Sequence, residues 1–144
     1  MKPALNSKTF LLRAIAAAML LFNGTGALYG GYSLINDPTG GGLQLPFEYL
    51  KPGIFTDYFI PGLILFVFNG IGSLLAAFYT IGHFSKYYLW VLAQGLILIV
   101  WIIVQLFMVT HVYYLQFILG GLGLMLILLA LLLKRKEEQF LKLA

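Results

Sequence analysis

The fold class is decided by residues 87–109, which read YYLWVLAQGLILIVWIIVQLFMV and contain no charged side chain. A helix of about 20 mostly apolar residues is long enough to cross a hydrocarbon core about 30 Å thick. This stretch therefore predicts a transmembrane helix.

Three further apolar stretches of similar length lie at residues 12–35, 59–82 and 112–133. The chain of 144 residues is 61% hydrophobic and 10% charged, whereas soluble domains average roughly 45–50% apolar and 25% charged residues. We therefore expect an all-α membrane protein with a single domain at residues 1–144. Its predicted architecture is an antiparallel bundle of four transmembrane helices, with one long outer loop at about residues 36–58 between the first two helices.

The first apolar stretch has an alternative interpretation as a secretory signal. Basic residues precede it, and the small residues Thr25 and Ala27 have a spacing typical of a cleavage site. Its apolar run continues to Ile35, however, which is longer than the core of about 7–15 residues in such signals. The length favours a transmembrane helix.

Basic residues indicate the orientation of the bundle, because loops on the cytoplasmic side carry an excess of Lys and Arg. If the N-terminus is cytoplasmic, only Lys51 of the 9 basic residues falls on the outer side. The others are Lys2, Lys8, Arg13, Lys86, Lys134, Arg135, Lys136 and Lys142. This asymmetry predicts a multi-pass protein of an inner membrane with both termini in the cytoplasm. The net charge of +4 is then a topology signal, and no nucleic-acid partner is expected.

The outer loop contains the acidic residues Asp37, Glu48 and Asp57. Residues 36–42 (NDPTGGG) predict a turn, because Asx side chains bond nearby backbone amides and glycine permits positive φ. Pro46 is suited to the first turn of a short helix, and residues 52–53 (PG) to its end. Two interpretations remain for this loop: a solvated connector, or a lid or partner-docking surface that uses the three acidic residues.

Three short motifs in and after this loop carry a family resemblance. They are DPTG at residues 37–40, LQLP at residues 43–46 and FTDYFIPG at residues 55–62. Together they resemble a pattern in small, uncharacterised four-helix bacterial membrane proteins. The resemblance implies a bacterial inner-membrane protein and carries no activity with it.

A Phe-Asn-Gly-x-Gly string occurs twice, at residues 22–26 and 68–72. Asn23 and Asn69 both fall near the middle of their predicted helices, so the sequence places them at a similar depth. Gln105 and Gln116 are nearly equidistant from the turn at residues 110–111, and a tight hairpin would bring them together. Small residues near the asparagines favour close helix packing with amide hydrogen bonds.

The polar side chains of the predicted helices define a candidate interior site. Its members are uncharged: Asn23, Asn69, Ser73, Gln94, Trp101, Gln105 and Gln116. They could line a polar cavity, or they could form hydrogen bonds that hold a filled bundle together.

Chemistry that requires metals, thiols or acid–base pairs is not expected. The chain has no cysteine and only two histidines, His83 and His111, which lie at opposite ends of a predicted helix. The three acidic residues of the outer loop have no histidine nearby in the sequence. We therefore expect neither an enzyme nor a bound cofactor or metal.

Two functions are compatible with these features. The leading hypothesis is a protein of the lipid bilayer that acts as an accessory or interaction subunit. Its expected partner is another membrane protein or a second copy of the chain. The alternative is the binding or passive transport of a small neutral or lipid-like molecule through the amide-lined interior of the bundle.

Overall fold

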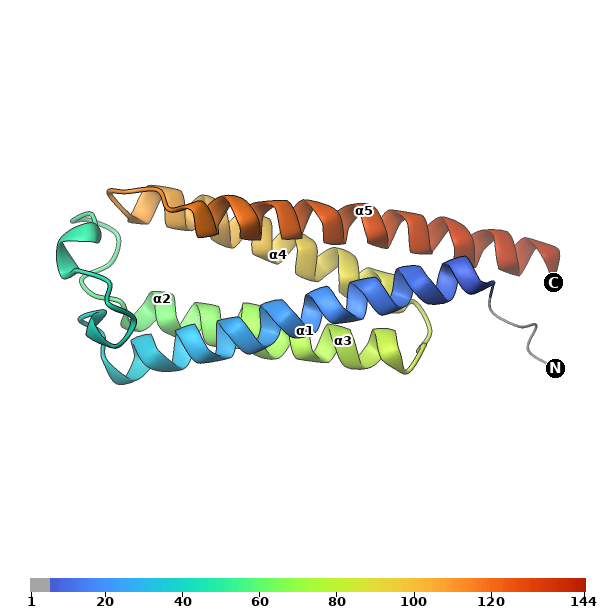
Figure 1. Ribbon diagram of the computed structural model, residues 1–144, viewed down its shortest axis with the longest axis horizontal. Coiled ribbons are helices and arrows are strands. Elements are labelled where there is room, and N and C mark those ends of the chain that lie inside the picture. Colours follow the sequence, from blue (N-terminus) through green and yellow to red (C-terminus); the bar gives the residue numbers. More distant parts are fainter. Residues whose placement is uncertain (1–5) are drawn as a thin grey trace.

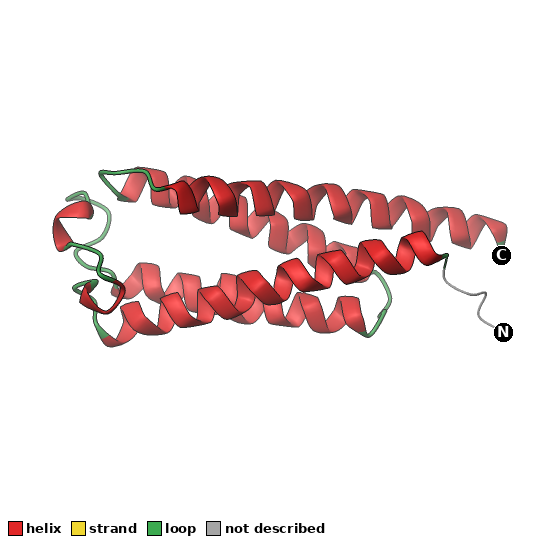
Figure 2. Ribbon diagram, viewed as in Figure 1, coloured by secondary structure: helices red, strands yellow, loops and turns green. Residues whose placement is uncertain are grey.

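The structure is a computed structural model that describes residues 6–144 and is all-helical, with 80% helix and no strand in that part of the chain. Its main elements are α1 (Ser7–Asn36), α2 (Phe59–Ile64), η3 (Leu65–Ile71), α3 (Gly72–Ile81), α4 (Tyr87–Met108) and α5 (Tyr114–Leu143) (Figures 1 and 2). Because α2, η3 and α3 follow one another without a break, they form one continuous helix. The described residues thus contain four helices that are long and apolar enough to cross a membrane.

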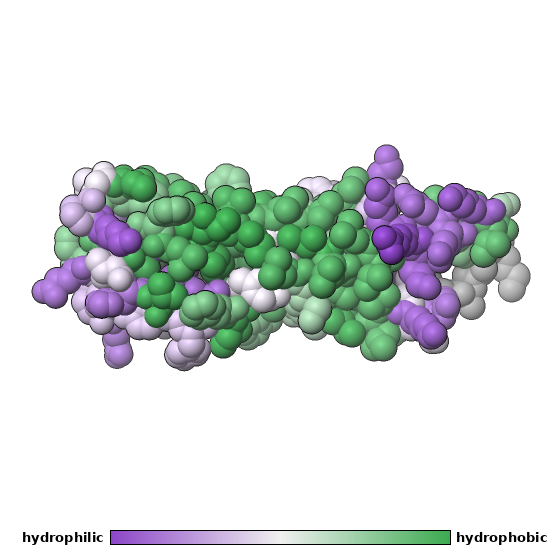
Figure 3. All heavy atoms as spheres, turned by 90° about the horizontal axis from the view of Figure 1, so that it is seen from above, coloured by the Kyte–Doolittle hydropathy of each residue, from purple (hydrophilic) through white to green (hydrophobic). Residues whose placement is uncertain are grey.

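The two ends of the molecule contain different parts of the chain. The start of α1, the connection from α3 to α4 and the end of α5 lie at one end, and the loop between α1 and α2 lies at the other (Figure 1). Figure 3 shows hydrophobic residues over the middle of the visible face and hydrophilic residues gathered at both ends. Lys2, one of the basic residues in the topology prediction, lies outside the described residues.

The helices pack mainly as two pairs, α1 against α2–η3–α3 and α4 against α5. Glycine is required where the backbones approach most closely, as in small-xxx-small packing. A Cβ on Gly31 would lie 2.7 Å from the backbone nitrogen of Phe66, and a Cβ on Gly95 would lie 3.0 Å from the carbonyl oxygen of Gly123. Each pair of helices therefore contains close glycine contacts of this kind.

The two pairs join in a core near the terminal end of the molecule. This core contains residues from all four long helices: Ala16, Leu20, Ala76, Ala77, Tyr87, Val91, Leu126, Leu129, Ala130 and Leu133. Arg13 is also buried there, and its guanidinium donates to the carbonyl oxygens of Thr80 at 3.0 and 3.2 Å and of Ile81 at 3.1 Å. Since these are among the last carbonyls of α3, Arg13 supplies hydrogen bonds that the helix itself cannot make.

Two of the long helices extend beyond their apolar stretches, and both for the same reason. The first helix begins at Ser7 rather than at residue 12, and the fourth continues past the apolar stretch that ends at residue 133 as far as Leu143. The predicted limits mark where hydropathy falls, whereas Lys, Arg and Glu are good helix formers that extend a helix into water. The start of α1 does carry a local signal, because the Asn6 side chain accepts a hydrogen bond from the backbone of Lys8.

The loop between α1 and α2 is compact. It contains two single 3₁₀ turns, η1 (Gly41–Leu43) and η2 (Phe47–Tyr49). The predicted short helix does start after Pro46, but it ends at Tyr49 instead of continuing to residues 52–53. It stops there because Leu50 pairs with Val109 in an antiparallel bridge, in which the amides of Lys51 and Thr110 donate to the carbonyls of Met108 and Tyr49.

Candidate functional site

The middle of the second long helix departs from α-helical geometry. Residues 65–71 form a π-helix, and the Gly72 amide donates to the carbonyl of Val67, five residues earlier. The Gln94 side chain of α4 donates to the carbonyl of Phe68 at 3.0 Å, and the absence of a side chain on Gly72 leaves room for it. Such π segments are rare and occur frequently at functional sites.

Asn69 lies within this π segment and is completely buried. Neither its Oδ1 nor its Nδ2 has a hydrogen-bond partner among residues 6–144. A buried polar group without a partner costs free energy, and most such groups in proteins are paired. The Asn69 amide is therefore costly to the fold as it stands.

A pocket of about 320 Å³ adjoins this amide. We call it the Asn69 pocket; its lining residues are Ile64, Phe68, Asn69, Leu96, Ile97, Val100, Trp101 and Val104. Trp101 is buried, and its Nε1 also has no hydrogen-bond partner in the described chain. Phe68, Leu96 and Val100 are exposed, so the pocket opens at the side of the helices, between the two helix pairs.

The other residues of the predicted interior site bond to protein groups. Asn23, which the sequence placed at a similar depth to Asn69, donates to the Ser73 hydroxyl at 2.8 Å. Gln116 donates to Gln105 over 3.5 Å, as the predicted hairpin requires, and Gln116 also accepts from the Tyr113 amide. The seven side chains thus divide into hydrogen bonds between helices and one pair, Asn69 and Trp101, that faces a pocket.

The acidic residues of the loop mostly serve the loop itself. The Asp37 carboxylate accepts from the amide and hydroxyl of Thr39 and from the amide of Gly42, at 2.5 to 3.2 Å. Asp57 accepts from the Phe59 amide at 2.9 Å, where α2 begins. Glu48 is the exposed member of the three acidic residues, whereas Asp37 and Asp57 are half-buried.

The DPTG motif ends in a glycine, Gly40, for a structural reason. Its φ is +83°, and a Cβ there would lie 2.5 Å from the carbonyl oxygen of Leu45 and 3.0 Å from the ring of Tyr58. Tyr58 is buried against the loop, where its hydroxyl donates to the Pro46 carbonyl at 3.3 Å. The motif therefore has a structural reason that does not involve a ligand.

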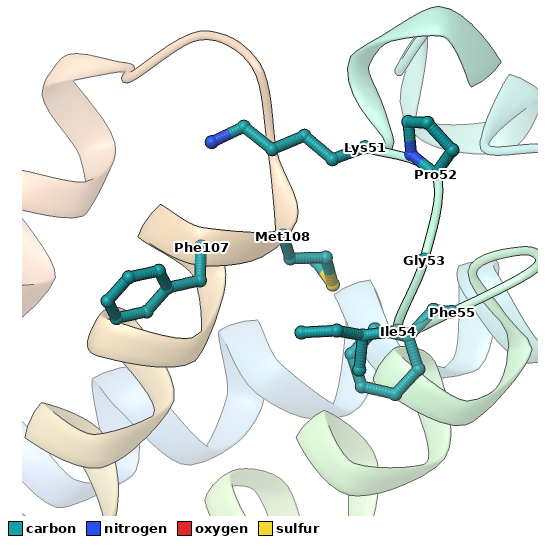
Figure 4. Close-up of a pocket in the computed structure, with 7 residues that line it drawn as sticks. All are labelled: Lys51, Pro52, Gly53, Ile54, Phe55, Phe107 and Met108. Atoms are coloured by element: carbon teal, nitrogen blue, oxygen red, sulfur yellow. The ribbon is translucent and has the colours of Figure 1, made fainter.

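A second pocket, of about 260 Å³, lies where the loop meets the end of α4. Figure 4 shows its lining, with residues 51–55 from the loop and Phe107 and Met108 from α4. The Lys51 side chain extends above Met108 in this view and is exposed. The buried side-chain atoms that lack partners in the described chain belong to Asn69 and Trp101. The described lining of the second pocket therefore contains no buried, unpaired polar side-chain atom for a ligand to bond.

Residues 6–144 contain no cluster of three or more His, Cys, Asp or Glu side chains that could hold a metal ion. The Asn69 pocket also has no charged lining residue. Comparison with protein-family models, with curated proteins and with solved structures finds no match to this chain. The geometry of the site is therefore the basis for the function proposed below.

Proposed function

We propose that this chain is an integral membrane protein whose four helices form an antiparallel bundle in a bacterial inner membrane, with both termini in the cytoplasm. The described basic residues support this orientation, because all except Lys51 belong to the start of α1, the α3–α4 connection or the end of α5. The exposed apolar side chains along all four helices are what contact with lipid requires.

Within this membrane bundle, we propose that the Asn69 pocket binds a small neutral or lipid-like molecule, without catalysis. The observation that carries the proposal is the fully buried Asn69 amide, unpartnered in the described chain, on the wall of a pocket of about 320 Å³. Ligand pockets are mostly apolar cavities of about 300–1,000 Å³ with a few polar groups. The Asn69 pocket is at the lower end of that range.

The geometry supports ligand binding better than the role of an accessory subunit. Asp37 and Asp57 form hydrogen bonds within and beside the loop, and Glu48 is the exposed acidic group there. The wall of the Asn69 pocket, in contrast, contains buried polar atoms that lack a partner among residues 6–144. A pocket that opens sideways also suits a molecule that arrives through the lipid.

Tryptophan fluorescence tests the binding function directly, because the chain has only 2 Trp residues. In the Trp90→Phe variant, Trp101 is the sole reporter, and it lines the Asn69 pocket. The purified variant in phosphatidylcholine nanodiscs is titrated with a dibrominated octadecanol, whose bromines quench indole fluorescence. We expect quenching that saturates and is reversed by unlabelled octadecanol.

The matched control is the Trp101→Phe variant, in which exposed Trp90 is the reporter. Trp90 should be quenched in simple proportion to the probe content of the bilayer, without saturation or reversal. If Trp101 behaves in the same way as Trp90, the proposed binding function is wrong.

A further inference from the structure

The polar atoms of the Asn69 pocket indicate which chemical class of lipid-like ligand would bind there. This inference rests on the proposed binding function. Asn69 presents one acceptor, Oδ1, and one donor group, Nδ2, while Trp101 presents a second donor, Nε1; none of the three atoms has a partner among residues 6–144. An amide needs both an acceptor and a donor opposite it to be satisfied. A ligand that only accepts hydrogen bonds would leave Asn69 Oδ1 unpaired.

The rest of the lining limits the charge of the ligand. Its other members are apolar: Ile64, Phe68, Leu96, Ile97, Val100 and Val104. Asn69 also lies near the middle of the long helix that runs from residue 59 to residue 81, far from either end. An ionised headgroup would lose its hydration there without gaining an opposite charge, which is strongly unfavourable.

The π segment explains how the pocket remains polar. The Gln94 amide donates to the Phe68 carbonyl and lies against Gly72, and Asn23 bonds to Ser73 within the pair formed by α1 and the second long helix. These two polar side chains are therefore already paired. Asn69 is left without a partner among residues 6–144, in the wall of the pocket.

From these observations we propose that the Asn69 pocket selects neutral lipid alcohols, meaning uncharged lipids with a free hydroxyl on a long apolar chain. The hydroxyl donates to Asn69 Oδ1 and accepts from Asn69 Nδ2 or Trp101 Nε1. The apolar chain lies along Phe68, Leu96 and Val100 and leaves through the side opening. Long-chain alcohols, polyprenols and diacylglycerols share this chemistry.

Competition in the Trp90→Phe fluorescence assay tests the selection. The competitors against dibrominated octadecanol are octadecanol, its methyl ether, octadecane and octadecyl phosphate. Octadecanol offers a hydrogen-bond donor and an acceptor, and its methyl ether offers an acceptor only. The alkane offers neither, and the phosphate carries a charged headgroup. We expect the methyl ether to compete about tenfold more weakly than the alcohol, since it leaves a buried acceptor unpaired. The alkane and the phosphate should be weaker still.

The Asn69→Leu variant provides the second measurement. It removes the acceptor while leaving Trp101 as reporter, so the alcohol and the ether should compete equally in it. Asn23→Leu removes an amide that faces Ser73 instead of the pocket, and it should keep the preference for the alcohol.

Two failures are distinguishable. If the wild-type pocket is saturated by the probe but the alcohol, the ether and the alkane compete equally, the selection of lipid alcohols is wrong while binding stands. If quenching never saturates, the binding function itself is wrong. Stronger competition by the phosphate than by the alcohol would also overturn the selection, in favour of a charged lipid.

Discussion

Asn23 and Asn69 occupy equivalent places in two copies of the same five-residue string, yet they have different environments. Asn23 is buried and donates to Ser73 at 2.8 Å. Asn69 is equally buried, but both polar atoms of its amide lack partners among residues 6–144. One asparagine therefore contributes to packing between helices, while the other imposes a cost that a ligand can offset.

This difference predicts opposite effects on stability for the same substitution. Asn23→Leu removes a buried hydrogen bond and should lower the free energy of unfolding by about 0.6–2 kcal/mol. Asn69→Leu removes an unsatisfied amide and should leave stability unchanged or raise it. Unfolding of the purified variants in mixed detergent micelles, followed by circular dichroism, measures both. An equal loss for the two variants would mean that Asn69 has a partner in the folded protein.

At the scale of elements, the glycine contacts and the π segment both belong to the helix that runs from residue 59 to residue 81. Gly62 lies close to Leu34 of α1, and Gly31 lies close to Phe66. These contacts fix α1 against the second helix on both sides of the point where the π segment begins. The π segment therefore begins where α1 and the second helix are in close contact.

Gly31→Ala tests one of these contacts. Its Cβ would lie 2.7 Å from the backbone of Phe66, so the helices must shift, and we expect a loss of about 1–3 kcal/mol in the free energy of unfolding. Gly26→Ala is the matched control in the same helix, because nothing lies within 4 Å of its Cβ. It should be neutral or stabilising by up to about 1 kcal/mol through helix propensity. Detergent unfolding of the two variants compares them, and equal changes in stability would show that the contact of Gly31 with Phe66 does not decide the result.

The loop provides a second test, through the acidity of Asp37. Hydrogen bonding from the Thr39 hydroxyl, with smaller contributions from the amides of Thr39 and Gly42, lowers the pKa of Asp37 below its usual value. A lowered folded pKa means that the charged form stabilises the loop fully above the unfolded pKa of about 3.9. This stabilisation is lost as the pH falls through the folded pKa.

We therefore expect residues 37–58 to resist pepsin at pH 4 and to become cleavable as the pH is lowered further. Asp37→Ala should be cleaved at both pH values, because it lacks the acceptor. Mass spectrometry of the fragments reads the cleavage sites. Equal resistance of wild type and variant across this range would show that the Asp37 hydrogen bonds do not order the loop.

On the scale of the whole molecule, the two helix pairs are connected at both ends, and between the ends they also pack through Leu98, Trp101 and Ile102 beside the Asn69 pocket. At the terminal end, His83 in the α3–α4 connection lies 2.9 Å from Glu137 of α5, and the Tyr87 hydroxyl donates to the same carboxylate at 3.2 Å. At the other end, the bridge between Leu50 and Val109 ties the loop to α4. Under the proposed binding function, a ligand enters from the side while both ends hold the pairs in place.

The proposed orientation is tested by labelling single cysteines, since the chain has none of its own. Glu48→Cys is suited to the loop because its side chain is exposed, whereas a Cβ on Gly41 would lie 2.7 Å from the Asp37 carboxylate. A membrane-impermeant maleimide should label Glu48→Cys from outside and Ala144→Cys only after the cells are opened. Leu124→Cys, on the apolar face of α5, should be labelled from neither side, and labelling of Glu48→Cys and Ala144→Cys from the same side would contradict the proposed orientation.

The sequence alone determined the number and approximate positions of the long helices, because uninterrupted apolar length is a local property. It also predicted the contact between Gln105 and Gln116, since a short turn fixes the register of the two helices that it joins. The bonding of Asn23 to Ser73, which leaves Asn69 without a partner among residues 6–144, was decided only by the tertiary structure. Whether a helix makes a π turn depends on which neighbours can accommodate the displaced backbone, here Gln94 from a helix more than twenty residues away. The pairing of Asn69 with Trp101 at one pocket follows from that turn and from the packing of α4, and neither is encoded in the residues next to Asn69.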